Sequence, residues 1–159
     1  MTTGRVLVAG IGNIFLGDDG FGPEVVRRIP PDQNPDVRIV DYGIRGMHLA
    51  YDLLDPWEAL VLVDALPDRG RPGRVEIVRP EPGPDHPAAL DAHGMDPAAV
   101  FAGVRALGAQ LPPTVVVGCQ VASTDEGIGL SEPVAASVAP AVDAVLRVVA
   151  GLLAQRTEV

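Results

Sequence analysis

Short apolar runs alternate along the chain with amphipathic segments, and turns rich in glycine, proline and aspartate separate them. The apolar runs predict strands at residues 5–10, 37–42, 59–63 and 114–121. Segments with helical spacing predict helices at residues 19–29, 47–54 and 96–108. The run ALVLV at 59–63 lacks alternation, which is typical of a strand buried on both faces. This alternation of strands and helices predicts a mostly parallel sheet covered by helices.

Two segments modify this plan. Residues 67–72 are too few to contain a crossover helix, so the strand expected at 74–78 should run antiparallel to the preceding one. Ser131 should cap a last helical region, which Pro140 should kink or split because an interior proline loses a backbone hydrogen bond. The sequence therefore predicts an α/β fold, a single three-layer α/β/α domain over residues 1–159 with a mostly parallel five-stranded sheet and one antiparallel strand.

The first apolar run leads into a glycine-rich turn and a helix, the usual setting of a nucleotide site. The dinucleotide fingerprint G-x-G-x-x-G begins at Gly10 and Gly12, but Phe15 occupies the position of its third glycine. The P-loop spacing also begins at Gly12, but Asp18 and Asp19 replace its lysine and hydroxyl residue. Two carboxylates would repel a phosphate, so the loop suits a cation or proton transfer better.

Acidic residues follow the predicted strands at one edge of the sheet, where ligands bind in open α/β folds. Asp19 follows the first strand, Asp41 ends the second and Asp64 ends the third. His93 precedes the helix that leads down to the fifth strand, which places it at the same edge. Carboxylate and imidazole groups suit a borderline divalent ion such as Ni²⁺ or Zn²⁺. By spacing alone, however, caps and solvated loop positions explain such residues more often than a metal site does.

The composition narrows the classes of function. A net charge of −9 argues against nucleic-acid binding, which needs a basic face. The single cysteine, Cys119, excludes an internal disulfide, and its mid-strand apolar setting predicts a packed core residue rather than a thiol nucleophile. The sequence contains no run of 18 apolar residues and no signal-peptide pattern, so we expect a cytoplasmic protein without membrane contact.

Residues 10–22, GIGNIFLGDDGFG, closely resemble the opening motif of the [NiFe]-hydrogenase maturation proteases, roughly G-[IV]-G-N-x-L-x-x-D-[DE]-G-x-G. Three later stretches resemble family patterns in the same order. Residues 41–47, DYGIRGM, resemble D-x-G-[TI]-x-G, and residues 127–134, GIGLSEPV, resemble G-x-x-L-S-x-x-V. Residues 118–121, GCQV, resemble G-x-Q-P, with Val121 in place of the proline. The resemblance covers almost the whole chain.

This resemblance implies an endopeptidase that removes the C-terminal extension of a [NiFe]-hydrogenase large-subunit precursor after nickel insertion. Matched position by position, it implies that Asp19, Asp64 and His93 recognise the nickel, with His86 as the alternative to His93. It also implies catalytic roles for Asp19, Asp41 and Asp64. For Asp41, a supporting catalytic role and a turn-stabilising role are equally balanced.

Several alternatives stay open at this point. The nickel is carried by the substrate, and the isolated protein need not hold a metal. Hydrolysis could be assisted by the metal or by a carboxylate. We expect a monomer whose partner is the precursor. A nickel-sensing chaperone that binds the precursor without cutting it is the main alternative, and a nucleotide-binding α/β protein is the other.

Overall fold

A computed structural model describes residues 5–31, 34–80 and 97–157. Within these residues the chain forms a five-stranded sheet with the strand order β2-β1-β3-β5-β4. The strands are β1 (Val6–Ile11), β2 (Val37–Gly43), β3 (Ala59–Leu66), β4 (Val75–Val78) and β5 (Thr114–Gln120). Neighbouring strands run parallel except β4, which pairs with β5 in the antiparallel direction. The predicted α/β fold with one antiparallel strand is confirmed.

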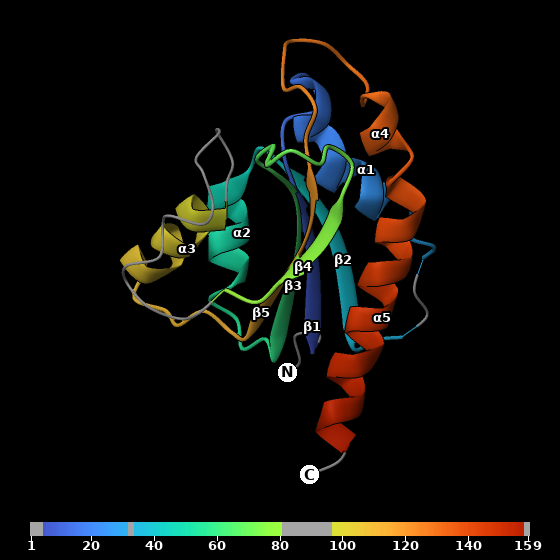
Figure 1. Cartoon of the computed structure of the whole chain (residues 1–159). Coiled ribbons are helices and arrows are strands. Elements are labelled where there is room, and N and C mark those ends of the chain that lie inside the picture. Colours follow the sequence, from blue (N-terminus) through green and yellow to red (C-terminus); the bar gives the residue numbers. More distant parts are fainter. Residues whose placement is uncertain (1–4, 32–33, 81–96, 158–159) are drawn as a thin grey trace.

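Helices cover both faces of the sheet (Figure 1). They are η1 (Gly17–Gly20, a 3₁₀ turn), α1 (Phe21–Arg28), α2 (Gly46–Asp52), α3 (Pro97–Ala106), α4 (Glu132–Ala135) and α5 (Val138–Thr157). Alternate residues of β1 point to opposite faces because strand side chains have a period of two. Val6 and Val8 pack with α1 and α5, whereas Leu7 and Ala9 pack with α2 and α3. The sheet is therefore the middle of three layers.

The parallel register places the predicted acidic residues at one level of the sheet. Gly10 of β1 pairs with Asp41 of β2 and with Val63 of β3, so Asp41 and Asp64 differ by one residue in height. The chain leaves β1 for η1 at this same carboxyl edge. The strand was predicted to end at Asp64, but β3 extends to Leu66, so Asp64 lies within the strand. The extra residues form a ladder with β5, in which Asp64 pairs with Gly118.

The direction of β4 follows the prediction, and its position adds a detail that the sequence did not reveal. β4 pairs with β5 at the edge of the sheet, not with β3, which directly precedes it in the chain. Both sides of β3 are occupied, by β1 and by β5. The short connection between β3 and β4 therefore leaves room for one strand between them, and β5, which comes later in the chain, occupies this position.

The C-terminal helical region splits as predicted, but upstream of Pro140. α4 ends at Ala135 and α5 begins at Val138, so Pro140 lies in the first turn of α5, where its missing N–H costs no hydrogen bond. By length and hydropathy alone, residues 132–155 would suit a membrane span, a test that core helices of soluble proteins also pass. The buried side chains of α5 belong to the core shared with α1.

Candidate functional site

Asp18 is fully buried and ties the loop after β5 to η1. Its Oδ2 accepts hydrogen bonds from the N–H groups of Ala122 (2.9 Å) and Ser123 (3.1 Å) and from the hydroxyl of Ser131 (2.8 Å). Its Oδ1 accepts one from the N–H of Ser131 (2.6 Å). Burial alone would raise the pKa of Asp18, but the donors at Ser131, Ala122 and Ser123 together hold it below its usual value. Asp18 is thus an ionised structural carboxylate.

Backbone pairing joins the same two loops. The N–H of Gly17 donates to the carbonyl of Gly127, and the N–H of Gly127 donates to that of Phe15, both at 2.9 Å. The N–H of Asp18 donates to the carbonyl of Ser123. The hydroxyl of Ser131 was expected to cap the helix that follows, but it donates to Asp18 and makes no capping bond. Residues 13–20 and 122–131 therefore form one unit at the carboxyl edge.

Asp19 is 6% exposed, and its Oδ2 accepts a hydrogen bond of 2.7 Å from the N–H of Asn13. The turn that allows this contact requires glycine at position 12. Gly12 has φ +144°, and a Cβ there would lie 2.0 Å from the carbonyl oxygen of Asp19. The G-x-G-N pattern thus lets the chain fold back on itself, with the backbone of Asp19 packed against Gly12.

Asp64 lies at the carboxyl edge of the sheet, as Asp19 does. It is 2% exposed, and its Oδ1 accepts a hydrogen bond of 2.8 Å from the N–H of Ala65. Gly22 brings α1 against the strands here, because a Cβ at this position would lie 2.3 Å from the carbonyl oxygen of Val63. The residues of η1 contact β3 as a result. The fold therefore brings two buried carboxylates, Asp19 of η1 and Asp64 of β3, to one corner of the carboxyl edge, where η1 contacts β3.

Asp41 stabilises a turn next to this corner. Its Oδ1 accepts a hydrogen bond of 2.9 Å from the N–H of Gly43, which has φ +56°. Arg45 donates from Nη2 to the backbone carbonyl of Asp41 at 2.8 Å. The carbonyl of Gly43 in turn accepts a hydrogen bond from the N–H of Gly12. Of the two roles weighed for Asp41, the contacts described here belong to the turn-stabilising one.

The two histidines expected near the site, His93 and His86, lie outside the described residues. The remaining histidine, His48, lies on α2 with its side chain 54% exposed and 3.7 Å from a carboxylate oxygen of Asp52. Among residues 5–31, 34–80 and 97–157, no group of three or more His, Cys, Asp or Glu side chains is arranged to hold a metal ion. The described part of the site therefore contains two of the three predicted nickel-recognising residues.

Gln120 has a role that the sequence analysis did not assign. It is 3% exposed, and its Oε1 accepts hydrogen bonds from the N–H groups of Arg69 (2.9 Å) and Arg71 (3.1 Å). Its Nε2 donates to Glu76 at 2.6 Å. Gln120 thus holds the connection between β3 and β4 against β5. The signal in the sequence for this role was a polar amide side chain at the end of an otherwise apolar strand.

Cys119 is a core residue, as predicted. It is fully buried in the cluster between the sheet and the helices α1 and α5. Burial raises the pKa of its thiol to about 11, so almost none of it is thiolate at neutral pH. A thiol protease built on Cys119 is therefore excluded, and water remains the candidate nucleophile.

Comparisons with known proteins identify the family of this chain. The family model described as hydrogenase maturation protease matches residues 23–148, which include Asp41 and Asp64 and begin just after Asp19. The hydrogenase 2 maturation protease of Escherichia coli is 33% identical over 149 residues, or 89% of this chain and 88% of that protein. The hydrogenase expression/formation protein HupD of Bradyrhizobium diazoefficiens is also 33% identical, over 92% of this chain and 78% of that protein.

A solved structure shows the same fold. The hydrogenase maturating endopeptidase HybD from E. coli superposes with a TM-score of 0.72 at 30% identity, over 92% of this chain and 93% of that one. Family model, relatives and fold together show that this chain belongs to the hydrogenase maturation protease family and is a peptidase.

Proposed function

We propose that this protein is an endopeptidase that removes the C-terminal extension of a [NiFe]-hydrogenase large-subunit precursor after nickel has been inserted. In this proposal Asp19, Asp64 and His93 contact the nickel that the substrate carries, so that only a loaded precursor is cut. The observation that carries the proposal is the burial of Asp19 and Asp64 at one corner of the carboxyl edge. Membership of the family supplies the reaction class.

The two carboxylates suit a cation for an electrostatic reason. Ionised carboxylates that share a corner poor in water repel each other, and a divalent ion between them removes that repulsion. Oxygen ligands with an additional imidazole are a donor set that Ni²⁺ accepts. The hydrogen bond from Asn13 to Asp19 and the one from Ala65 to Asp64 orient the two side chains before any cation arrives.

Hydrolysis then needs an activated water at the scissile bond. Water adds to the peptide carbonyl carbon, a carboxylate of the site accepts its proton, and the C–N bond breaks as the leaving amine is protonated. Polarisation of the carbonyl or the water by the substrate's nickel would serve the same step. Asp19 and Asp64 are the groups placed for proton transfer, and Asp41 supports them by holding the adjoining turn.

The rim of this edge is suited to a protein substrate. Large apolar side chains there are exposed, and they come from the loop after β1 and from the segment that joins β2 to the start of α2: Phe15, Ile44 and Met47, each more than half exposed. Exposed apolar side chains around a polar centre are typical of a surface that contacts another protein. The folded body of the precursor would cover them while its nickel reaches the aspartates.

Co-expression with the large-subunit precursor, with and without nickel, tests the proposal. The wild type should shorten the nickel-loaded precursor, and Asp19→Asn and Asp64→Asn should slow this step at least about 100-fold. His93→Ala and His86→Ala decide which histidine takes part. The matched control is Asp143→Asn, on the exposed side of α5, which should cleave as the wild type does. Stable precursor binding without cleavage by the wild type would replace this proposal with a nickel-sensing chaperone.

A further inference from the structure

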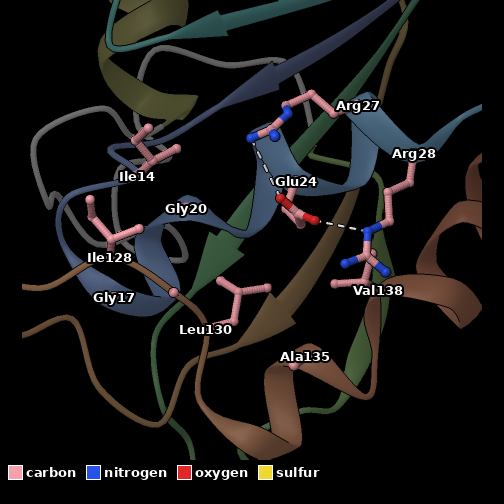
Figure 2. Close-up of a pocket in the computed structure, with 11 residues that line it drawn as sticks. Ile14, Gly17, Gly20, Glu24, Arg27, Arg28, Ile128, Leu130, Ala135 and Val138 are labelled. Atoms are coloured by element: carbon pink, nitrogen blue, oxygen red, sulfur yellow. Dashed lines mark hydrogen bonds and ion pairs between the residues drawn. The ribbon is translucent and has the colours of Figure 1, made fainter.

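A concave feature runs along α1, beside the corner that contains Asp19 and Asp64. It is a cleft of about 280 Å³ between α1, the loop after β5 and the start of the C-terminal helices. Figure 2 shows Ile14 and Ile128 at one end of it and Arg28 at the other, with Glu24 between them. The proposed reaction assigns no role to this cleft.

The cleft begins where the proposed active site ends. Gly17, Gly20 and Ile14 line it, and they belong to the same loop that carries Asp19. Its first end is apolar, because the side chains of Ile14 and Ile128 are 40% and 78% exposed there. A chain lying in the cleft would therefore continue directly from the scissile bond, and its first residues would meet apolar side chains.

The far end of the cleft carries an excess of positive charge. Glu24 accepts a hydrogen bond from Nε of Arg28 at 2.8 Å and lies 3.6 Å from Nη1 of Arg27. Two guanidinium groups thus share one carboxylate, and both arginine side chains are 60% exposed. This local charge of +1 lies on a protein whose net charge is −9. An acidic ligand would therefore be attracted to the two arginines at this end of the cleft.

We propose that this cleft binds the removed C-terminal extension of the precursor as an extended chain, with an acidic side chain of the extension against Arg27 and Arg28. This inference rests on the proposed function. From Asp19 to Arg27 the chain rises about 12 Å, at about 1.5 Å per helical residue. An extended peptide covers that span with about four residues, at about 3.3 Å each. The acidic residue should therefore stand about four positions beyond the cut.

The size of the cleft identifies the extension, rather than the folded body, as its occupant. A volume of about 280 Å³ accommodates a few side chains and not a folded surface. The body of the precursor is held at the nickel site and the apolar rim, so the segment that enters the cleft is the one that continues past the scissile bond. The cleft thus sets a preference for the composition of the extension.

The test compares cleavage of nickel-loaded precursors whose extensions carry Glu or Gln at the third, fourth or fifth position after the cut. With the wild type, Glu should lower KM about threefold to fivefold at low salt, the size expected of exposed charge pairs, with kcat unchanged. The double variant Arg27→Gln/Arg28→Gln should lose this preference, and Arg27→Lys/Arg28→Lys should retain most of it. Glu24→Gln, which raises the local charge, should strengthen it.

The control is Arg147→Gln, an exposed arginine on α5 outside the cleft, which should leave the preference intact. Thermal unfolding of each variant separates loss of recognition from loss of structure. If the wild type cleaves Glu and Gln extensions with equal KM at all three positions, the cleft proposal is wrong and the proposed function stands. If the wild type cleaves no precursor at all, the proposed function falls and this inference falls with it.

Discussion

Two neighbouring aspartates in η1 have opposite environments. Asp18 accepts four hydrogen bonds from the loop after β5 and is fully buried by it. Asp19 accepts a hydrogen bond from Asn13 in its own loop and lies at the corner that also holds Asp64. One carboxylate is thus used to build the edge of the sheet, and the other is presented at that edge. In the proposed function, these adjacent residues of the same type therefore divide structure and chemistry between them.

The largest effect on stability should come from removing the carboxylate of Asp18. Asp18→Ala leaves three buried or partly buried N–H groups and a hydroxyl without their acceptor, so we expect a loss of about 3–5 kcal/mol in the free energy of unfolding. Urea denaturation followed by circular dichroism measures it. A loss as small as that of Asp19→Asn would contradict the division of roles.

Asp19→Asn should show the reverse profile. Asparagine keeps an oxygen that accepts from Asn13, so the free energy of unfolding should change by less than about 1 kcal/mol. Cleavage of the nickel-loaded precursor should fall at least about 100-fold, because the amide neither binds nickel as strongly nor accepts a proton. The cleavage rate and the free energy of unfolding should be measured on the same preparation of Asp19→Asn. A stable variant that cleaves as the wild type does would show that Asp19 takes no part in the mechanism.

Lowering the pH should remove the stabilisation that ionised Asp18 gives to the fold. The pKa of Asp18 lies below its usual 3.8 in the folded state, so its ionised form stabilises the fold above pH 3.8, and this contribution is lost as the pH falls through the folded pKa. The stability difference between the wild type and Asp18→Asn should be constant near neutral pH and shrink below about pH 4. A stability difference that grows on acidification would show that the pKa of Asp18 is raised, not lowered, in the folded state.

The smallest effect on stability should come from a change at Val121, which directly precedes the loop of residues 122–131 that Asp18 binds. The N–H of Val121 donates to the carbonyl of Leu66 at 3.0 Å, a bond that proline, the residue of the family pattern, cannot make. Val121→Pro should cost at most about 1 kcal/mol, since proline also restricts the unfolded chain. Cleavage should be retained. Loss of cleavage without loss of stability would show that this position, and not Asp18 alone, sets the loop.

The sequence was sufficient for the fold because the alternation of apolar strands and amphipathic helices is a local signal. It also placed Asp41 and Asp64 at the carboxyl edge, since parallel strands end together. It did not reveal the role of Asp18, whose partners Ala122 and Ser131 lie 104 and 113 residues away. Only the tertiary structure brings those donors to it. The position of β4 beyond β5 was hidden for the same reason.

The bonds from Asp18 to the 122–131 loop also affect the order of folding. Contacts between residues more than 100 positions apart form late, because closing so long a segment costs entropy that only later contacts recover. We therefore expect the loop that contains Asp19 to be completed only after β5 has joined the sheet and residues 122–131 have docked. On the proposed function, a partly folded chain would lack the finished edge, so we expect cleavage only from the completely folded peptidase.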